Sequence, residues 1–322
     1  MGSGVTPLAP VTRKQVLSAR GRIGDRLHRT PTLTSRALED RVGAPVYLKA
    51  ELFQRTGSFK PRGVLNVLGS LTPEERAPGI IGISAGNHAQ ALAYCAALER
   101  LDCLVVMWTG ASEQKIEATL AYGADVDLTA DDPGGAFERL EELRTTSGRI
   151  FVHPFDDPRT IAGQGTVGLE VAEDVPEVSV VVVPVGGGGL VAGIVAALEN
   201  VRVVAVEPER APALHAALAA GLPVPVEPTS IADGLNAPFA GANPLAVCRG
   251  RVESVLVSEA EIAAGMRFLY MRAKLACEPA GAAGVAALLA GKIDVAPHET
   301  VAVVVSGGNV AARTASAILA GE

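Results

Sequence analysis

The chain has 322 residues, of which 48% are hydrophobic and 20% charged, so it can bury a sizeable core in one large unit or two domains. Its net charge of −7 excludes the basic surface that binding to nucleic acid or an anionic membrane requires. The N-terminus shows no charged segment followed by an apolar run, and no apolar stretch reaches membrane-spanning length, so a cytoplasmic protein is expected.

The first predicted elements lead to a lysine. Apolar positions at helical spacing predict a helix from Thr12 to His28, and a second helix is expected from Leu33 to Val42. A strand at Val46–Lys49 then leads to Thr56-Gly57-Ser58-Phe59-Lys60-Pro61-Arg62-Gly63, in which Lys60 opens a helix.

Lys60 is a candidate for chemistry. A lysine that acts as a nucleophile or base at neutral pH must lose its proton more easily than a solvated ammonium, which requires partial burial or a nearby cation. Phe59 removes water on one side, and Arg62 is close in sequence. Gly57 and Gly63 would let a flat ligand approach the backbone. Because an isolated lysine is more often solvated, the assignment depends on the segments that follow.

Strands and helices alternate between residues 80 and 152. Strands separated by helices of about ten residues predict right-handed βαβ units and a parallel sheet. The strands are expected at Ile80–Ile83, Cys103–Met107, Asp125–Leu128 and Ile150–Val152, and the helices at Asn87–Leu98, Glu113–Tyr122 and Gly134–Thr145.

The alternation resumes in the second half. The expected elements are a helix to Ala172, a strand at Val178–Val183, a glycine loop, a helix to Leu198, a strand at Arg202–Val206, loops from Gly221 to Pro244, helices at Ser258–Lys274 and Pro279–Leu289, a strand at Val301–Val305 and a final helix. The predicted fold class is therefore α/β with two open parallel sheets. Residues 1–67 and 153–322 would form a large domain, and residues 68–152 a small inserted one.

The four cysteines, Cys95, Cys103, Cys248 and Cys277, form no CxxC pair. This spacing argues against a disulfide framework and against a zinc ribbon. It fits a reducing cytoplasm.

The loop Gly186-Gly187-Gly188-Gly189 follows a strand and opens a helix. Backbone N–H groups and the helix dipole converge there, which suits a phosphate. The loop also matches GxGxxA, and Glu207 ends the next strand where a nicotinamide-dependent oxidoreductase keeps its ribose-binding acid. Four consecutive glycines suit a monophosphate better than a pyrophosphate, and an oxidoreductase would leave the lysine segment unexplained.

A second strand-to-helix junction lies at Ser84-Ala85-Gly86-Asn87-His88. Ser84 ends the strand, and Asn87 can cap the helix. A helix start that is rich in donors suits a carboxylate, such as the α-carboxylate of an amino acid.

Together these segments resemble the motifs of the fold-type II pyridoxal-phosphate enzymes, in the branch of the serine/threonine dehydratases and serine racemases. The lysine segment, Ser84–Gln90, Ile161–Thr166, Pro184–Leu190 and Ser306–Asn309 agree with that family in order and spacing. The resemblance implies the tryptophan synthase β-like architecture, pyridoxal 5'-phosphate as cofactor and a small-molecule amino acid as substrate. Relatives are commonly dimers, so a homodimer is implied as well.

The resemblance also implies roles for individual residues. Lys60 would hold the cofactor as a Schiff base and remove the Cα proton of the substrate. Ser84, Asn87 and His88 would bind the substrate carboxylate, and Asn236 would influence substrate choice. The hydroxyl of Ser306 would face the pyridine nitrogen, which makes the ring a weaker electron sink than a carboxylate would. The residues implied to contact the cofactor are Phe59, Lys60, Asn87, Gly186, Gly187, Gly188, Gly189, Leu190, Glu278 and Ser306.

Two departures from the family bear on the reaction. Serine racemases of this branch have a second serine where this chain has Ala85, and an alanine has no exchangeable proton, which argues against efficient racemisation. Magnesium-dependent members continue from the glutamate matching Glu207 to an acid that here is Ala213. No metal is therefore predicted.

The predicted function is dehydration and deamination of L-threonine, L-serine or both, giving 2-oxobutanoate or pyruvate plus ammonia. The residues leave other functions open: a serine racemase, a dehydratase of another 3-hydroxy amino acid, the nicotinamide-dependent oxidoreductase, or an amino-acid sensor without catalytic activity. They do not distinguish threonine from serine as the substrate.

Overall fold

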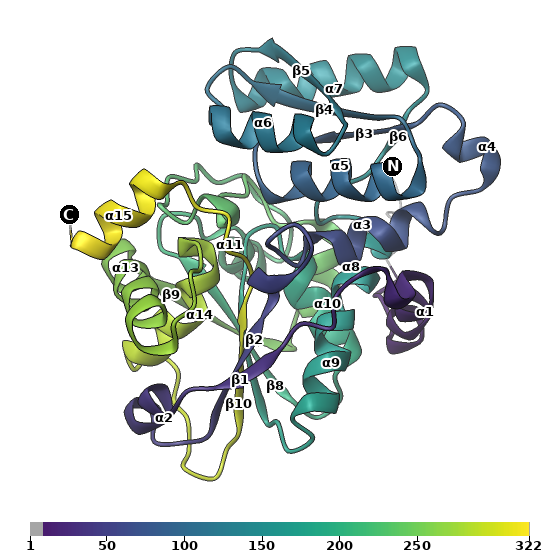
Figure 1. The fold of residues 1–322 in the computed structure, drawn as a ribbon. Coiled ribbons are helices and arrows are strands. Elements are labelled where there is room, and N and C mark those ends of the chain that lie inside the picture. The colour runs from purple at the N-terminus through teal and green to yellow at the C-terminus, as the bar shows by residue number, and fades with distance from the viewer. Residues whose placement is uncertain (1–8, 322) are drawn as a thin grey trace.

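The computed structural model describes residues 9–321, which fold around two sheets (Figure 1). The larger sheet has six strands in the order β1-β2-β10-β7-β8-β9, and the smaller has four in the order β5-β4-β3-β6. Neighbouring strands run parallel in both sheets, except that β1 pairs with β2 antiparallel. The predicted α/β class with two parallel sheets is confirmed.

The two sheets come from different parts of the chain. The larger sheet contains β1 (Thr32–Thr34), β2 (Val46–Ala50), β7 (Val180–Pro184), β8 (Arg202–Pro208), β9 (Val252–Val257) and β10 (Val301–Val305). The smaller contains β3 (Ile80–Ile83), β4 (Cys103–Trp108), β5 (Asp125–Ala130) and β6 (Ile150–Phe151). Each sheet with its helices is called here the large unit or the small unit, and the strands of the small unit all fall within the predicted inserted domain.

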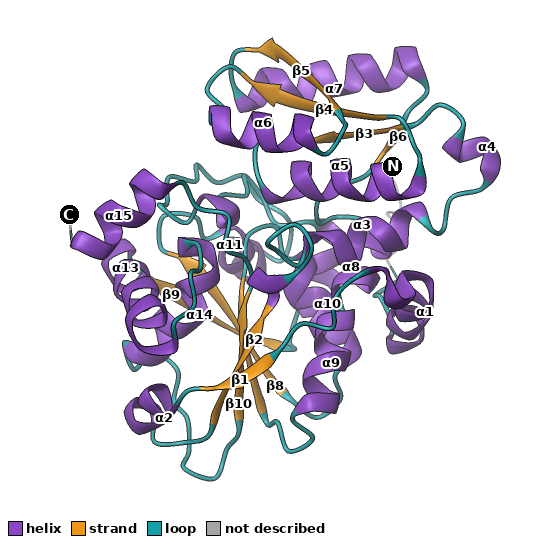
Figure 2. Ribbon diagram, viewed as in Figure 1, coloured by secondary structure: helices purple, strands orange, loops and turns teal. Residues whose placement is uncertain are grey.

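Helices cover both faces of each sheet (Figure 2). One face of the large sheet packs on α1 (Arg13–Ile23), α8 (Pro158–Gln164), α9 (Thr166–Asp174), α10 (Gly189–Ala197), α11 (Ala213–Ala220) and α12 (Ala242–Cys248). Its other face packs on α2 (Arg36–Val42), α13 (Glu259–Phe268), α14 (Pro279–Leu289) and α15 (Ala312–Ala320). The small sheet lies between α7 (Pro133–Ser147) and a layer of α3 (Lys60–Leu68), α5 (Asn87–Glu99) and α6 (Glu113–Ala121), while α4 (Pro73–Arg76) is a short connection.

Helix α3 joins the two units. It packs against α8 of the large unit and against α5 of the small unit. Its apolar residues Val64 and Leu65 belong to the core of the small unit, although α3 follows β2 of the large sheet. Lys60, the first residue of α3, therefore lies where the two units meet.

Two predicted helices differ from those observed. The helix expected from Leu33 is wrong at its start, because the β-branched residues of β1 pair with β2 and α2 begins only after Ser35. The single helix expected up to Ala172 is two helices, α8 and α9, which meet at Gly165. A Cβ on Gly165 would lie 2.5 Å from the carbonyl oxygen of Gly193, so close packing against α10 accompanies this break.

The C-terminal half also departs from the prediction. The helix expected from Ser258 to Lys274 is α13 followed by a π-helical turn, Leu269–Ala273, which ends at Lys274 with φ of 60°. The loops expected from Gly221 to Pro244 contain a 3-10 turn at Asp233–Leu235 and the start of α12. Helices α4 and α11 and strand β9 were not predicted, although β9 carries the alternating pattern of an edge strand.

Neither cysteine pairing nor a membrane span appears in the part of the chain that the structure describes. The four cysteines are buried free thiols. Within residues 9–321, every helix is too short or too polar to cross a bilayer.

Candidate active site

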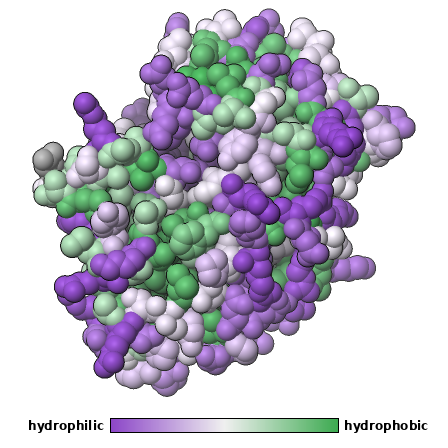
Figure 3. Space-filling model, in the orientation of Figure 1, coloured by the Kyte–Doolittle hydropathy of each residue, from purple (hydrophilic) through white to green (hydrophobic). Residues whose placement is uncertain are grey.

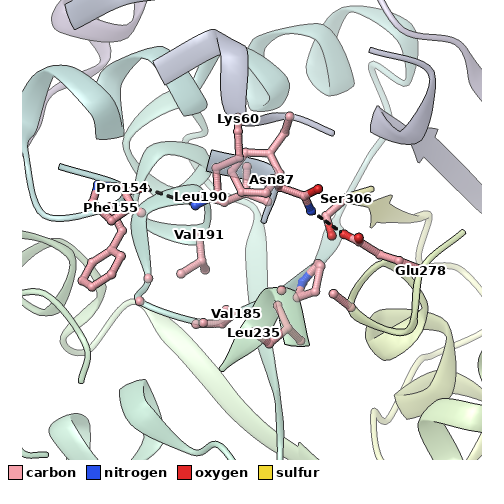
Figure 4. Close-up of a pocket in the computed structure, with 18 residues that line it drawn as sticks. Lys60, Asn87, Pro154, Phe155, Val185, Leu190, Val191, Leu235, Glu278 and Ser306 are labelled. Carbon is pink, nitrogen blue, oxygen red and sulfur yellow. Dashed lines mark hydrogen bonds between the residues drawn. The ribbon is translucent and has the colours of Figure 1, made fainter. Parts of the chain in front are cut away.

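A pocket lies between the two units, and Figure 4 shows the side chains that line it. Strands β7 and β10 of the large sheet end at this pocket, and β3 of the small sheet leads toward it through α5. The carboxyl ends of parallel strands are where α/β proteins bind ligands, because the following loops and helix starts gather there. The lining residues are Phe59, Lys60, Asn87, Pro154, Phe155, Pro184, Val185, Gly186, Gly187, Gly188, Gly189, Leu190, Val191, Gly234, Leu235, Glu278, Ala280 and Ser306.

Lys60 extends into the pocket from the start of α3. Its Nζ donates a hydrogen bond to the carbonyl oxygen of Pro154 at 3.1 Å (Figure 4). It also lies 5.2 Å from the centre of the Phe59 ring. Burial lowers the pKa of Lys60 to about 8, while the nearby charge of Glu278 opposes that change. The amine therefore loses its proton more readily than a solvated lysine does.

Arg62 does not supply the nearby cation that the sequence suggested. Its guanidinium points away from Lys60 and is almost fully buried between two carboxylates. Nε and Nη2 donate to the two oxygens of Glu51 at 2.8 Å each, and Nη1 donates to Glu170 at 2.6 Å. Lys49 completes this buried charge cluster with an ion pair of 2.8 Å to Glu170. The cluster anchors the turn before α3, and burial alone lowers the pKa of Lys60.

Gly57 and Gly63 are needed for packing rather than for a ligand. Gly57 has φ of +72°, and a Cβ there would lie 2.4 Å from Oδ1 of Asn309. A Cβ on Gly63 would lie 2.4 Å from Nε2 of Gln164. Since neither glycine lines the pocket, the expectation that a flat ligand approaches them is wrong.

The four-glycine loop between β7 and α10 fits a phosphate. Within residues 9–321, the backbone N–H groups of Gly187 to Leu190 have no protein acceptor, and these residues line the pocket at the start of α10. Gly188 has φ of +92°, and a Cβ on Gly187 would lie 2.3 Å from the ring of Phe155. The loop is therefore built to bring unpaired donors close to an anion.

Glu207 does not belong to this pocket. Its carboxylate is fully buried and accepts hydrogen bonds from the N–H groups of Leu214 at 2.6 Å and His215 at 2.7 Å, at the start of α11. Burial raises the pKa of Glu207 to about 8. The residue stabilises a helix start and is not placed to bind the ribose of a dinucleotide. Among residues 9–321, no group of three His, Cys, Asp or Glu side chains is arranged to hold a metal.

Asn87 links the two units across the pocket. Its Nδ2 donates to Oε1 of Glu278 at 2.7 Å, and its Oδ1 accepts from Nδ2 of Asn309 at 2.8 Å (Figure 4 shows the first bond). Burial, assisted by the charge of Asp233, raises the pKa of Glu278 to about 8, so this carboxyl holds a proton more readily than a solvated glutamate does. Ser306 follows β10 on the same side of the pocket, and its carbonyl accepts from the N–H of Phe59 at 3.2 Å.

Three of the predicted site residues direct their side chains elsewhere. Ser84 accepts a bond from the N–H of Gly86 at 3.1 Å, and Nε2 of His88 lies 2.9 Å from the carbonyl oxygen of Val152. Burial lowers the pKa of His88 to about 3, so its imidazole is neutral. The amide of Asn236 bonds to the backbone N–H and carbonyl of Ser230 at 3.2 and 2.8 Å. None of the three lines the pocket.

Several lining residues were not predicted as site residues, among them Pro154, Phe155 and Val191. Phe155 packs against the glycine loop and Leu235 against Gly186. Pro154 and Phe155 follow the end of β6. Because ligands bind where the ends of parallel strands gather, this position could have identified both as site residues. Leu235 lies in the same loop as Asn236, for which the family resemblance implied a role in substrate choice.

A family profile described as pyridoxal-phosphate dependent enzyme matches residues 23–307. The chain belongs to this family. It is 41% identical to the L-threonine ammonia-lyase of Geobacter sulfurreducens, over 94% of this chain and 77% of that protein. It is 40% identical to the catabolic L-threonine dehydratase TdcB of Escherichia coli strain K12, over 94% of each chain.

The fold of this pyridoxal-phosphate enzyme matches a solved relative closely. The maize serine racemase superposes with a TM-score of 0.91 at 32% identity, over 95% of this chain and 96% of that one. The resemblance, the fold-type II architecture and pyridoxal 5'-phosphate as cofactor, all predicted from the motifs, are thereby confirmed. The residues present fit that cofactor, because a buried amine and unpaired N–H donors face the same pocket.

We expect the amine of Lys60 in the cofactor-free protein to titrate near pH 8, because burial disfavours the ammonium form. Competitive labelling with acetic anhydride at a series of pH values, followed by peptide mass spectrometry, measures this midpoint. A short lysine peptide in the same reaction is the control and should titrate at about 10.4. A midpoint for Lys60 equal to that of the peptide would contradict the buried environment.

Replacing Arg62 with Met should lower the free energy of unfolding by about 3–5 kcal/mol, because Glu51 and Glu170 lose their main buried partner. Urea unfolding of the cofactor-free protein measures the loss. Arg144→Met is the matched control: its ion pair with Glu141 is exposed and should cost less than about 1 kcal/mol. Equal losses in the two variants would show that the buried cluster has no special role.

Proposed function

We propose that this pyridoxal-phosphate enzyme is a dehydratase of the ammonia-lyase type, which converts L-threonine, L-serine or both to 2-oxobutanoate or pyruvate plus ammonia. The observation that carries the proposal is one pocket in which the buried amine of Lys60 and the four-glycine loop lie together. The names of the bacterial relatives, threonine ammonia-lyase and threonine dehydratase, support the reaction type.

Each part of the pocket has a function in this reaction. Pyridoxal phosphate, when bound, supplies an electron sink for the electron pair left at the substrate Cα. The N–H groups of Gly187 to Leu190 would hold its phosphate, with Phe59 and Ser306 beside the ring. Lys60 is the base that takes the Cα proton, and its lowered pKa suits that work near neutral pH.

The start of α5 would bind the substrate carboxylate through its backbone. The first N–H groups of a helix lack intrahelical acceptors, and the helix dipole favours an anion there. The side chains of Ser84 and His88 are engaged in internal bonds, and the N–H of Ser84 donates to Val106, so the donors would be the N–H groups of Asn87 and His88. The ammonium of Lys115, which is paired with Asp233, lies 3.9 Å from the position of a Cβ on Gly86 and so stands near this segment.

The small unit would close over the bound substrate. Three contacts join the units near the pocket: the bond from Asn87 to Glu278, the bond from Asn309 to Asn87, and an ion pair between Lys115 and Asp233. Closure of residues 68–152 on the large unit would exclude water from the reacting centre. The absence of a hydroxyl at Ala85, in the segment before α5, favours elimination over racemisation in this closed state.

A cytoplasmic homodimer is the proposed assembly. The four buried free thiols fit a reducing compartment.

Figure 3 shows apolar side chains gathered near the centre of the drawn face. Large apolar side chains are exposed at Phe53, Tyr270 and Met271, at 47%, 47% and 60%. A Cβ on Gly308 would lie 3.3 Å from Leu52, the neighbour of Phe53, and 2.9 Å from the carbonyl of Ala276, which follows the turn that holds Tyr270 and Met271. We propose that these exposed side chains contribute to the subunit interface.

The purified holoenzyme should release a 2-oxo acid and ammonia from L-threonine or L-serine, and Lys60→Ala should lower kcat by at least about 10³-fold. A coupled assay of the 2-oxo acid measures the reaction, with the exposed Lys14→Ala as the control variant. Unchanged activity in Lys60→Ala would refute the catalytic assignment. Conversion of L-serine to D-serine faster than to pyruvate would identify a racemase instead.

Met271→Asp should convert the dimer to a monomer, because a buried unpaired carboxylate opposes association. Sedimentation velocity at several protein concentrations measures the mass. Leu222→Asp is the matched control, since Leu222 is also exposed, at 58%, but lies at the end of α11 outside the proposed interface. A dimer that survives the first change, or is lost equally with the second, would place the interface elsewhere.

A further inference from the structure

The side chain of Asn309 joins three segments around the pocket. Asn309 lies in the loop after β10, and its Nδ2 donates two hydrogen bonds: to the carbonyl oxygen of Thr56 at 2.7 Å and to Oδ1 of Asn87 at 2.8 Å. Thr56 belongs to the turn that carries Lys60, and Asn87 is the first residue of α5 in the small unit. A single amide therefore connects the lysine turn, the β10 loop and the small unit.

These bonds decide the orientation of the Asn87 amide. An amide nitrogen carries two donors and no acceptor, so Nδ2 of Asn309 requires an oxygen opposite it. Asn87 must then present Oδ1 to Asn309 and Nδ2 to Glu278, to which it donates at 2.7 Å. If the Asn87 amide were reversed, two NH₂ groups would face each other and the bond to Glu278 would need a proton from the carboxyl.

Close packing holds Asn309 in place. A Cβ on Gly57 would lie 2.4 Å from Oδ1 of Asn309, so the amide sits directly against the backbone of the lysine turn. The N–H of Gly308 donates to the carbonyl oxygen of Gly57 at 2.9 Å and ties the two loops together. The amide of Asn309 is therefore fixed by its surroundings and can fix its neighbour in turn.

We propose that Asn309 is a positioning residue for the reaction. It holds Asn87 with its nitrogen directed at Glu278, and so keeps a donor of fixed orientation at the wall of the pocket opposite the glycine loop. Because Asn309 also bonds to the lysine turn, it links the position of the small unit to that of Lys60. The kinetic part of this inference rests on the proposed dehydratase function, whereas the hydrogen-bond coupling does not.

Asn309→Asp tests the role, because it keeps the shape of the side chain and removes both donors. The Asn87 amide should then reverse, so that its nitrogen donates to the introduced carboxylate and its oxygen faces Glu278. We expect kcat/KM for L-threonine to fall by about 10-fold to 100-fold, mainly through kcat.

We also expect the pH profile of kcat to shift, because Glu278 is then held in its protonated form. A purely structural defect would leave the profile unchanged. Wild-type kcat/KM and an unshifted profile would overturn the proposal.

A double-mutant cycle tests the coupling in the cofactor-free protein without any activity assay. If Asn309 acts through Asn87, the urea midpoint of Asn87→Ala/Asn309→Ala should lie above the value expected from adding the two single losses. Asn66→Ala is the matched control: it removes a buried amide that donates to the carbonyl of Arg159 at 2.7 Å, and its loss should add to that of Asn87→Ala.

Additive losses for Asn87 and Asn309 would overturn the inference even if the enzyme dehydrates threonine. Coupled losses in a protein without dehydratase activity would support the hydrogen-bond role and refute only the proposed function. Should Asn309→Asp fail to fold, Asn309→Ala takes its place in the kinetic test, because it removes the same donors without adding a charge.

Discussion

The bidentate contact of Arg62 with Glu51 is the interaction on which the site most depends. A buried guanidinium loses its hydration, and that loss is compensated only when hydrogen bonds satisfy its donors in good geometry. Glu51 and Glu170 provide that geometry from two different parts of the chain, and Lys49 balances the second carboxylate. Because Arg62 lies in the first turn of α3, the cluster fixes the start of the helix and with it the direction of the Lys60 side chain.

The fixed start of α3 contributes to a site only because the ends of other strands lie beside it. Strands β7 and β10 end at the pocket with the glycine loop and Ser306, and their parallel direction brings both ends to one edge. Helix α3 then passes into the core of the small unit, which places α5 over the same edge. The pocket is thus a consequence of topology, and the residues after each strand determine its chemistry.

The sequence predicted what depends on local pattern and missed what depends on distant partners. Lys60, the glycine loop and Ser306 follow strands at short spacing, so their convergence could be anticipated. The partner of Arg62, Glu170, is 108 residues away, and no local pattern indicates such a pair. Likewise the inward bonds of His88 and Asn236 could not be anticipated, because a polar residue beside a pocket can equally satisfy its neighbours' backbone.

Burial acts in opposite directions on the pKa values of Lys60 and Glu278, the two titratable side chains that line the pocket. It lowers the pKa of Lys60 to about 8 and raises the pKa of Glu278 to about 8, since each environment disfavours the charged form. Burial therefore weakens the positive charge of Lys60 and the negative charge of Glu278 alike. The N–H groups at the N-terminus of α10, which line the same pocket, supply the attraction for a phosphate. The hydrogen bond from Asn87 to Glu278 persists whether or not that carboxyl is ionised, because Asn87 is the donor.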